Sequence, residues 1–547
     1  MEVERTTELR NLALIVAGFV AVLLFLPPQH EYPIIDDWIY HGSVQHQLAT
    51  GAFAMPNQAQ ANLVGQTLWA TAWAGLLGLS YTTLTYSTLA LALPGLLALY
   101  GIMREVDVPP SGALLGTVLF GLNPIFLHLS YSFMTDVPFI SLLMVACWCY
   151  LRGLNARGYA WLLAGGLTAG WAFLIRQFAV LVPAGFGLYL LLDMLLTRRL
   201  RLRQLIGVGL LPALIVGSWW LWSRNMPPSG ADIAVAARRA TFFLKDPWPT
   251  VFLLRALAVM PFTALSAWTA IRLRCFGWRL MLPLIVALGA AWAWVSSLQH
   301  GWIAMTEPPG VVSIGPVTLN LPPEIDTFFG AGDILRSGGL DFYQYRQAPI
   351  WTPDAWRWLF VLGSILGLLL LAKMAAGLLD WLRACRTRSG FTPLAGLYLS
   401  GLMIFVVSLA ATGDFYDRYL LGFLPFLIIF LVRGSRSWGR VAWGYALTVA
   451  VVWSGFSLLL KADEIAHDNA RWQAGYWLAA RAQPVQLGFD WNNIYGYSNG
   501  TYEITDVSIP GFRTERSFPY RSILSGDGTR YLLAQSRQDM PPLPNLP

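Results

Sequence analysis

The chain has 547 residues, 56% of them hydrophobic and 12% charged, and a formal net charge of +7. Soluble domains carry about 25% charged residues, so this composition excludes a soluble protein and indicates a polytopic membrane protein. The positive charge does not indicate a nucleic-acid partner, because the cations follow the membrane topology and no basic stripe alternates with aromatic residues.

Apolar runs near the roughly 20 residues that span a bilayer follow one another along the chain. They are residues 12–26, 84–103, 113–129, 137–150, 159–175, 178–196, 205–222, 251–271, 280–298, 358–379, 391–412, 419–432 and 441–460. We therefore expect an α-helical polytopic membrane protein with about 13 transmembrane helices within residues 1–460. Residues 68–79 are apolar but too short to span, which predicts a re-entrant or short partial helix.

Basic residues gather in alternate connections between these runs, and such connections face the cytoplasm in membrane proteins. They are Arg5, Arg10, Arg104, Arg152, Arg157, Arg198, Arg199, Arg201, Arg203, Arg272, Arg274, Arg279, Arg383, Arg386, Arg388, Arg433, Arg436 and Arg440. We therefore expect a cytoplasmic N-terminus and an extracytoplasmic C-terminus. The first run is followed by Pro27-Pro28 and no small-residue cleavage site, so it is expected to be an uncleaved anchor.

Four segments outside the apolar runs are long enough to build a site: residues 27–66, 224–250, 299–357 and 461–547. Residues 231–244 have the spacing of a helix that lies in the membrane interface. Residues 299–357 are rich in Pro, Gly and aromatic residues, which favours a loop over a cavity. Residues 461–547 combine a helical pattern with short alternating runs and predict a small extracytoplasmic α/β region.

Two adjacent carboxylates, Asp36 and Asp37, follow the first apolar run, in a stretch without Lys or Arg between Arg10 and Arg104. The topology alone explains the missing cations, so their absence is not a sign of catalysis. The carboxylates have structural explanations as well: Asp36 could cap a loop helix, with Asp37 as its solvated neighbour.

Three further ionisable residues fall on the same predicted face: Asp136, Arg176 and Arg418. Ionisable groups at membrane depth are costly and usually functional. Arginine forks match phosphate oxygens and a carboxylate can accept a proton from a hydroxyl, so this group predicts a site for an anionic, lipid-borne substrate.

The two arginines also have structural alternatives. Arg176 could extend to the lipid headgroups, and Arg418 could pair with an acidic residue of its own segment, Asp414 or Asp417.

No cofactor is expected, because the chain lacks a Gly-x-Gly-x-x-Gly motif after a strand and a Walker loop. The pair Cys147-x-Cys149 has no second pair of ligands nearby, so no metal site is expected there. A divalent cation that bridges Asp36, Asp37 and a phosphate stays open.

The order of these motifs resembles the C-class membrane glycosyltransferases, in particular bacterial relatives of protein O-mannosyltransferases and of lipid A aminoarabinose transferases. The resemblance rests on the external Asp-Asp pair, Asn123-Pro124, Thr135-Asp136-Val137-Pro138, Leu174-Ile175-Arg176 and Asp417-Arg418-Tyr419-Leu420-Leu421. It implies a bacterial inner-membrane enzyme that transfers a sugar, with inversion, from a polyprenyl-phosphate donor to a lipid, glycan or protein acceptor on the external face.

The resemblance also implies roles for individual residues. Asp36 matches the general base that activates the acceptor hydroxyl, and Asp37 matches its more variable acidic partner. Asp136 matches an Asp that orients the acceptor or the base. Arg176 stands where the aminoarabinose transferases have a Lys facing the donor phosphate, and Arg418 is a second candidate phosphate ligand.

A transporter of a lipid-linked or anionic substrate is the alternative function. Transporter sites usually lie near the bilayer midplane between repeated halves. Here the candidate charges fall at the predicted outer ends and no repeat is evident, which favours an enzyme. The glycosyltransferase interpretation requires Asp36, Asp136 and Arg176 to converge on one cavity.

Overall fold

The computed structural model describes residues 2–224 except 33, 35, 36 and 57–60, residues 392–411 and 417–481, five short strands and single positions between 282 and 383. Six described helices are long and apolar enough to cross a membrane, or seven if one bent pair forms a single span. The chain is therefore an α-helical, multi-pass membrane protein. Predicted spans 251–271, 280–298 and 358–379, and the interfacial helix 231–244, lie outside the described residues apart from single positions.

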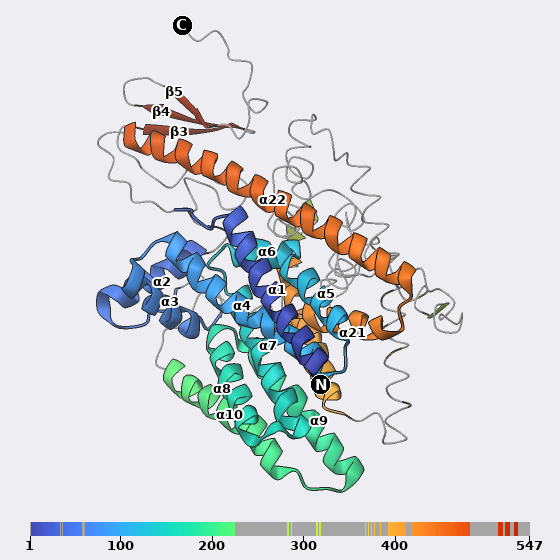
Figure 1. Cartoon of the computed structure of the whole chain (residues 1–547). Helices are drawn as coiled ribbons and strands as arrows, with labels where there is room; N and C mark the ends of the chain where they lie inside the picture. The colour runs from blue at the N-terminus through green and yellow to red at the C-terminus, as the bar shows by residue number, and fades with distance from the viewer. Residues whose placement is uncertain are drawn as a thin grey trace.

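The N-terminal half of the chain forms a bundle of antiparallel helices (Figure 1). These are α1 (Glu2–Phe25), α4 (Tyr81–Glu105), α5 (Pro110–Gly121), α6 (Pro124–Ser130), α7 (Asp136–Arg152), α8 (Tyr159–Ile175), α9 (Leu181–Thr197) and α10 (Leu202–Ser223). The ends of α1, α6 and α8 lie at the same end of the bundle as the starts of α4 and α7. We call this the site end, because the candidate residues are found there.

One predicted span, residues 113–129, is broken in the structure. Helices α5 and α6 differ in direction by 60°, and the break falls at Asn123-Pro124. Asn123 caps α6 by accepting a hydrogen bond from the backbone of Ile125 at 3.0 Å, and Pro124 cannot donate a backbone hydrogen bond to continue α5.

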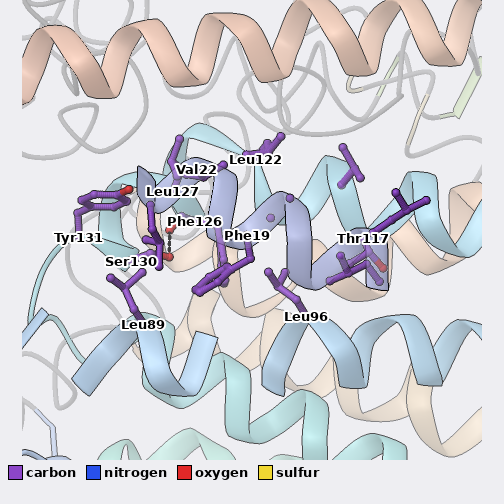
Figure 2. A pocket seen from close by; sticks show the side chains of 16 residues that line it. Phe19, Val22, Leu89, Leu96, Thr117, Leu122, Phe126, Leu127, Ser130 and Tyr131 are labelled. Atoms are coloured by element: carbon purple, nitrogen blue, oxygen red, sulfur yellow. Dashed lines mark hydrogen bonds between the residues drawn. The ribbon is translucent and has the colours of Figure 1, made fainter. Parts of the chain in front are cut away.

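An apolar cavity of about 110 Å³ lies between α1, α4, α5 and α6. Figure 2 shows Tyr131 at one end of this cavity and Thr117 at the other, with Phe19 and Phe126 between them. The bend between α5 and α6 thus leaves an unfilled space and directs Tyr131 toward the site end.

A second predicted span, residues 419–432, is also wrong in length. The segment begins with the 3-10 helix η5 (Asp417–Gly422), and only α21 (Leu424–Val432) is α-helical. Nine residues reach only about 14 Å, less than half of the bilayer core. Arg418 therefore sits in a short turn and not at the start of a regular spanning helix.

Two short helices, α2 (Asp37–Thr50) and α3 (Val64–Leu77), lie between the first two spans at the site end. Each has 14 residues, about 21 Å, so neither can cross the membrane. Helix α3 packs against α2, α4 and α8, as Figure 1 shows beside the blue part of the bundle. This agrees with the short partial helix expected over residues 68–79.

The C-terminal half contributes α20 (Leu394–Ala411), α21 and α22 (Arg440–Arg481). The boundary expected at residue 460 falls inside α22, a helix of 42 residues. Strands β3 (Phe512–Ser517), β4 (Tyr520–Ser525) and β5 (Arg530–Leu533) form an antiparallel sheet in the order β3-β4-β5. In residues 299–357, β1 (Ser313–Ile314) pairs with β2 (Val317–Thr318), and the rest of that loop lies outside the described residues.

Small residues allow the bundle helices to approach closely, as is usual inside membranes. A Cβ atom added to Gly95 of α4 would lie 2.6 Å from Cβ and 2.7 Å from Cα of Ser141 on α7. Gly209 of α10 has open space around the same position.

We expect Gly95→Ala to lower the free energy of unfolding by about 1–3 kcal/mol, because the added methyl group forces α4 and α7 apart. Gly209→Ala is the matched control and should leave stability unchanged or slightly raised, since Ala favours helix. Thermal unfolding of both variants in detergent measures the difference. Equal stability of the two would show that the α4–α7 contact is not as tight as described.

Candidate functional site

The described candidate residues all lie at the site end of the bundle. Asp37 begins α2, Asp136 begins α7, Arg176 directly follows α8, and Arg418 lies in η5. Asp36 lies outside the described residues. Residues that are far apart in the sequence are thus brought to one end of the fold, as the sequence predicts.

Asp37 is completely buried and joins two connecting segments at the site end. One carboxylate oxygen accepts a hydrogen bond from the backbone of Ile34 at 2.7 Å. The other accepts one from the backbone of Phe133 at 3.4 Å. The alternative of a solvated neighbour is therefore wrong for Asp37, whose carboxylate anchors the segment before α2 to the segment before α7.

Two amide side chains extend this anchoring. Gln66 of α3 donates to the carbonyl of Phe133 at 2.7 Å, and Asn62 donates to the carbonyl of Phe173 near the end of α8 at 2.7 Å. Both side chains are buried. Sequence reasoning missed these residues, and the only signal for them was two amides beside an apolar run.

Asp136 and Arg176 form a largely buried ion pair in which Nη1 of Arg176 donates to Oδ1 of Asp136. The side chain of Asp136 is 4% exposed and that of Arg176 is 16% exposed. Arg176 has an extended backbone that ends α8, so its side chain reaches the start of α7. The headgroup alternative is therefore wrong for Arg176. The second oxygen of Asp136 has no hydrogen-bond partner among the described residues.

Arg418 lines the same cavity as this ion pair. The guanidinium carbons of Arg176 and Arg418 lie 6.0 and 5.7 Å from the ring centroid of Tyr419, a distance typical of cation–π contacts. Phe139, Phe178, Ile404, Ser408, Leu421 and Gly422 also line the cavity. Its described lining therefore contains two cations and one carboxylate.

The cavity is small, about 30 Å³, which is room for one or two water molecules. Apolar side chains make up much of its lining, a condition in which a charge interacts strongly with its neighbours. Such an arrangement can bind an anionic group if the arginine side chains move apart.

Among the described residues, no group of three or more His, Cys, Asp or Glu side chains is placed to hold a metal ion. Cys147 and Cys149 are buried within α7. A cation site that includes Asp36 lies outside the described residues.

We expect Asp136→Asn or Arg176→Gln alone to lower the free energy of unfolding by about 3–5 kcal/mol, because each leaves the partner's charge buried. The double variant should lose less than the sum. Denaturant unfolding in detergent micelles gives the free energies of unfolding of the wild type, the two single variants and the double variant. Asp193→Asn and Arg201→Gln form the control cycle: that pair lies at the opposite end with Arg201 32% exposed, and should couple less. Purely additive losses at Asp136 and Arg176 would contradict the ion pair.

Comparison with known proteins identifies one matching family. Residues 58–222 match the model of the dolichyl-phosphate-mannose-protein mannosyltransferase family. This part of the chain contains α3 to α10, with Asp136 and Arg176. No match was found among curated protein sequences.

Three solved structures give distant matches. The first is the S. cerevisiae protein O-mannosyltransferase Pmt1–Pmt2 complex bound to the sugar donor, with 16% identity, a TM-score of 0.33, and coverage of 41% of this chain and 35% of that chain. ArnT from Cupriavidus metallidurans bound to undecaprenyl phosphate has 16% identity, a TM-score of 0.36, and coverage of 85% and 80%. The archaeal oligosaccharyltransferase AglB from Archaeoglobus fulgidus has 12% identity, a TM-score of 0.44, and coverage of 83% and 56%.

The chain thus spans about a third of the matched yeast chain and four fifths of the matched ArnT chain. The family-model match over residues 58–222 confirms that the chain resembles the membrane glycosyltransferases of the protein O-mannosyltransferase group.

Proposed function

We propose that the protein is a membrane glycosyltransferase that moves a sugar from a polyprenyl-phosphate donor to an acceptor hydroxyl on the extracytoplasmic face, with inversion. The observation that carries the proposal is the convergence of Asp136, Arg176 and Arg418 on one buried cavity, at the end of the bundle where Asp37 begins α2.

The two arginines suit the leaving group. A polyprenyl phosphate departs as an anion, and guanidinium groups stabilise the charge that develops on its oxygens. The gain is largest where water is excluded, as around the buried side chain of Arg418, which is 8% exposed.

The small volume of the cavity gives the ion pair a role in binding. A phosphate can enter only if Arg176 turns away from Asp136 and toward the phosphate oxygens. The carboxylate of Asp136 is then released to accept a hydrogen bond from the acceptor or to orient the base. Arg176 thus exchanges Asp136 for the phosphate when the donor binds, and the Asp136 carboxylate exchanges Arg176 for a hydrogen-bond donor.

The two adjacent carboxylates, Asp36 and Asp37, have different roles in this proposal. Both oxygens of Asp37 accept backbone hydrogen bonds, which suits an anchor better than a proton acceptor. We therefore assign the general base to Asp36 and a positioning role to Asp37. A base needs hydrogen-bond reach of the acceptor hydroxyl and an ionised carboxylate at the working pH.

The position of the charges favours the enzyme over a transporter. A transported substrate is expected to bind near the bilayer midplane, whereas Asp136 and Arg176 lie at helix ends. The polyprenyl chain of the donor keeps the reaction at the membrane, so a site at the end of the bundle is where such a transfer has to occur.

We expect Asp36→Asn to abolish sugar transfer, since an amide cannot accept the proton of the hydroxyl. Transfer from a radiolabelled polyprenyl-phosphate sugar to the envelope fraction measures the effect. Asp107→Asn is the matched control, because Asp107 is exposed at the opposite end of the bundle, and should keep wild-type activity. Wild-type transfer by a folded Asp36→Asn protein would remove Asp36 from the base role.

We expect Arg418→Gln to weaken binding of polyprenyl phosphate by about 10-fold or more, because a hydrogen bond from a charged donor contributes about 1.5–3 kcal/mol. Equilibrium binding of the labelled lipid to purified protein provides the measurement. Arg436→Gln, at an exposed arginine of the 3-10 helix η6 (Arg433–Ser437), is the control. Equal affinity of the two variants would place the phosphate elsewhere.

A further inference from the structure

A buried histidine in the first external segment contacts the second, and these two segments carry the candidate acids. His30, between α1 and α2, is 6% exposed. Its Nδ1 lies 2.9 Å from the carbonyl oxygen of Tyr32. Its Nε2 lies 3.0 Å from the hydroxyl of Thr85 on α4 and 3.1 Å from the carbonyl oxygen of Tyr131. One imidazole ring therefore contacts three segments of the chain.

The backbone around His30 is also fixed. Its N–H donates to the hydroxyl of Thr82 at 3.1 Å, and that hydroxyl donates to the carbonyl of His30 at 2.9 Å. The hydroxyl of Tyr131 donates to the carbonyl of Leu26 at the end of α1 at 2.6 Å. Tyr131 thus contacts the chain between α1 and α2 at two points, at Leu26 through its hydroxyl and at His30 through its carbonyl oxygen.

These contacts form the first of two links between the external segments. His30 meets the carbonyl of Tyr131, and Asp37 accepts from the backbone of Phe133. Asp36 lies between His30 and Asp37 in the sequence, and Tyr131 and Phe133 precede Asp136. Chain positions on either side of Asp36 are thereby anchored to the segment that leads to Asp136.

We propose, on the basis of the function proposed above, that His30 is a positioning residue for the transfer reaction and that it acts through the contacts of Nε2 with Thr85 and Tyr131. These contacts hold the first external segment in register with the start of α7. His30 touches no substrate and takes no part in proton transfer.

The surroundings of the ring make this contact sensitive to acid. Burial, and then the positive charge of Lys461 on α22, lower the pKa of His30, while Glu31 and the two carbonyl contacts raise it by less. Lys461 is itself buried, 5.1 Å above the ring of Tyr131. The docked ring is therefore neutral at neutral pH and can donate to only one of the two carbonyl groups. The tautomer that links the two segments is the one in which Nε2–H donates to the carbonyl of Tyr131.

The direction of the pH effect follows from the lowered pKa of the docked ring, that is, of His30 in the contacts described above. An undocked histidine has a pKa of about 6.5, above that of the docked ring, so protons bind preferentially to the undocked form. The docked arrangement is fully favoured above pH 6.5 and is lost progressively as the pH falls below that value. An ordinary aspartate base loses its charge near pH 3.9. Loss of the docked histidine and protonation of the base therefore occur in different pH ranges.

Two variants test the proposal because their amides reach different parts of the site. The amide of His30→Gln extends to the position of Nε2, where its oxygen can accept from Thr85 and its nitrogen can donate to Tyr131. The amide of His30→Asn reaches only the position of Nδ1. We expect His30→Asn to lower kcat about three- to tenfold with KM unchanged, and His30→Gln to restore kcat.

The same assay over a pH series distinguishes positioning from general stability. Wild-type activity should fall below pH 6.5, and His30→Gln should lack this fall. His46→Gln and His46→Asn, at an exposed position of α2, are the controls and should match wild type. Equal activity of the two His30 variants, or an unchanged acid limb in His30→Gln, would overturn the proposal.

Hydrogen exchange separates this inference from the proposed function. In purified protein, exchange of peptides covering residues 26–40 should rise in His30→Asn and stay as in wild type in His30→Gln. This readout needs no enzymatic activity, so absence of transfer in wild type would contradict the proposed function alone. Unchanged exchange in His30→Asn would contradict the positioning role.

Discussion

The arrangement of the site depends on one buried ion pair, between Asp136 at the start of α7 and Arg176 at the end of α8. Removing two charges from water costs several kcal/mol each, and their attraction repays this only in good geometry. A pair of apolar residues would join the same two helices at lower cost. The ion pair lies in a cavity with Arg418 and Tyr419, which gives this cost a functional explanation, since an anionic ligand can take the place of Asp136 beside Arg176.

Around this pair, the connecting segments at the site end are held by single side chains bonded to backbone groups. Asp37, Gln66 and Asn62 bond to the segments before α7 and at the end of α8, and His30 adds a contact at Tyr131. Each bond satisfies a buried peptide group that has no helical partner. The geometry of the candidate site thus rests on a few polar contacts at the ends of rigid helices, which is where precise placement is easiest to maintain.

The sequence predicts the bundle well because a spanning helix is recognised from local composition. It does not predict the bend at Asn123-Pro124 or the short helix α21, because the apolar runs there are continuous and only proline chemistry breaks them. The convergence of Asp136 and Arg176 follows from the topology. The anchoring role of Asp37 does not, since its partner Phe133 is 96 residues away. The resemblance noted from the motifs is confirmed for residues 58–222.

The most direct test of the central claim is photocrosslinking of a polyprenyl phosphate that carries a reactive group next to its phosphate. If the phosphate binds between Arg176 and Arg418, the label will appear in peptides that contain residues 176–180 and 417–422, and excess unlabelled polyprenyl phosphate will remove it. Competable labelling confined to other parts of the chain, such as the apolar cavity between α1 and α5, would contradict the account.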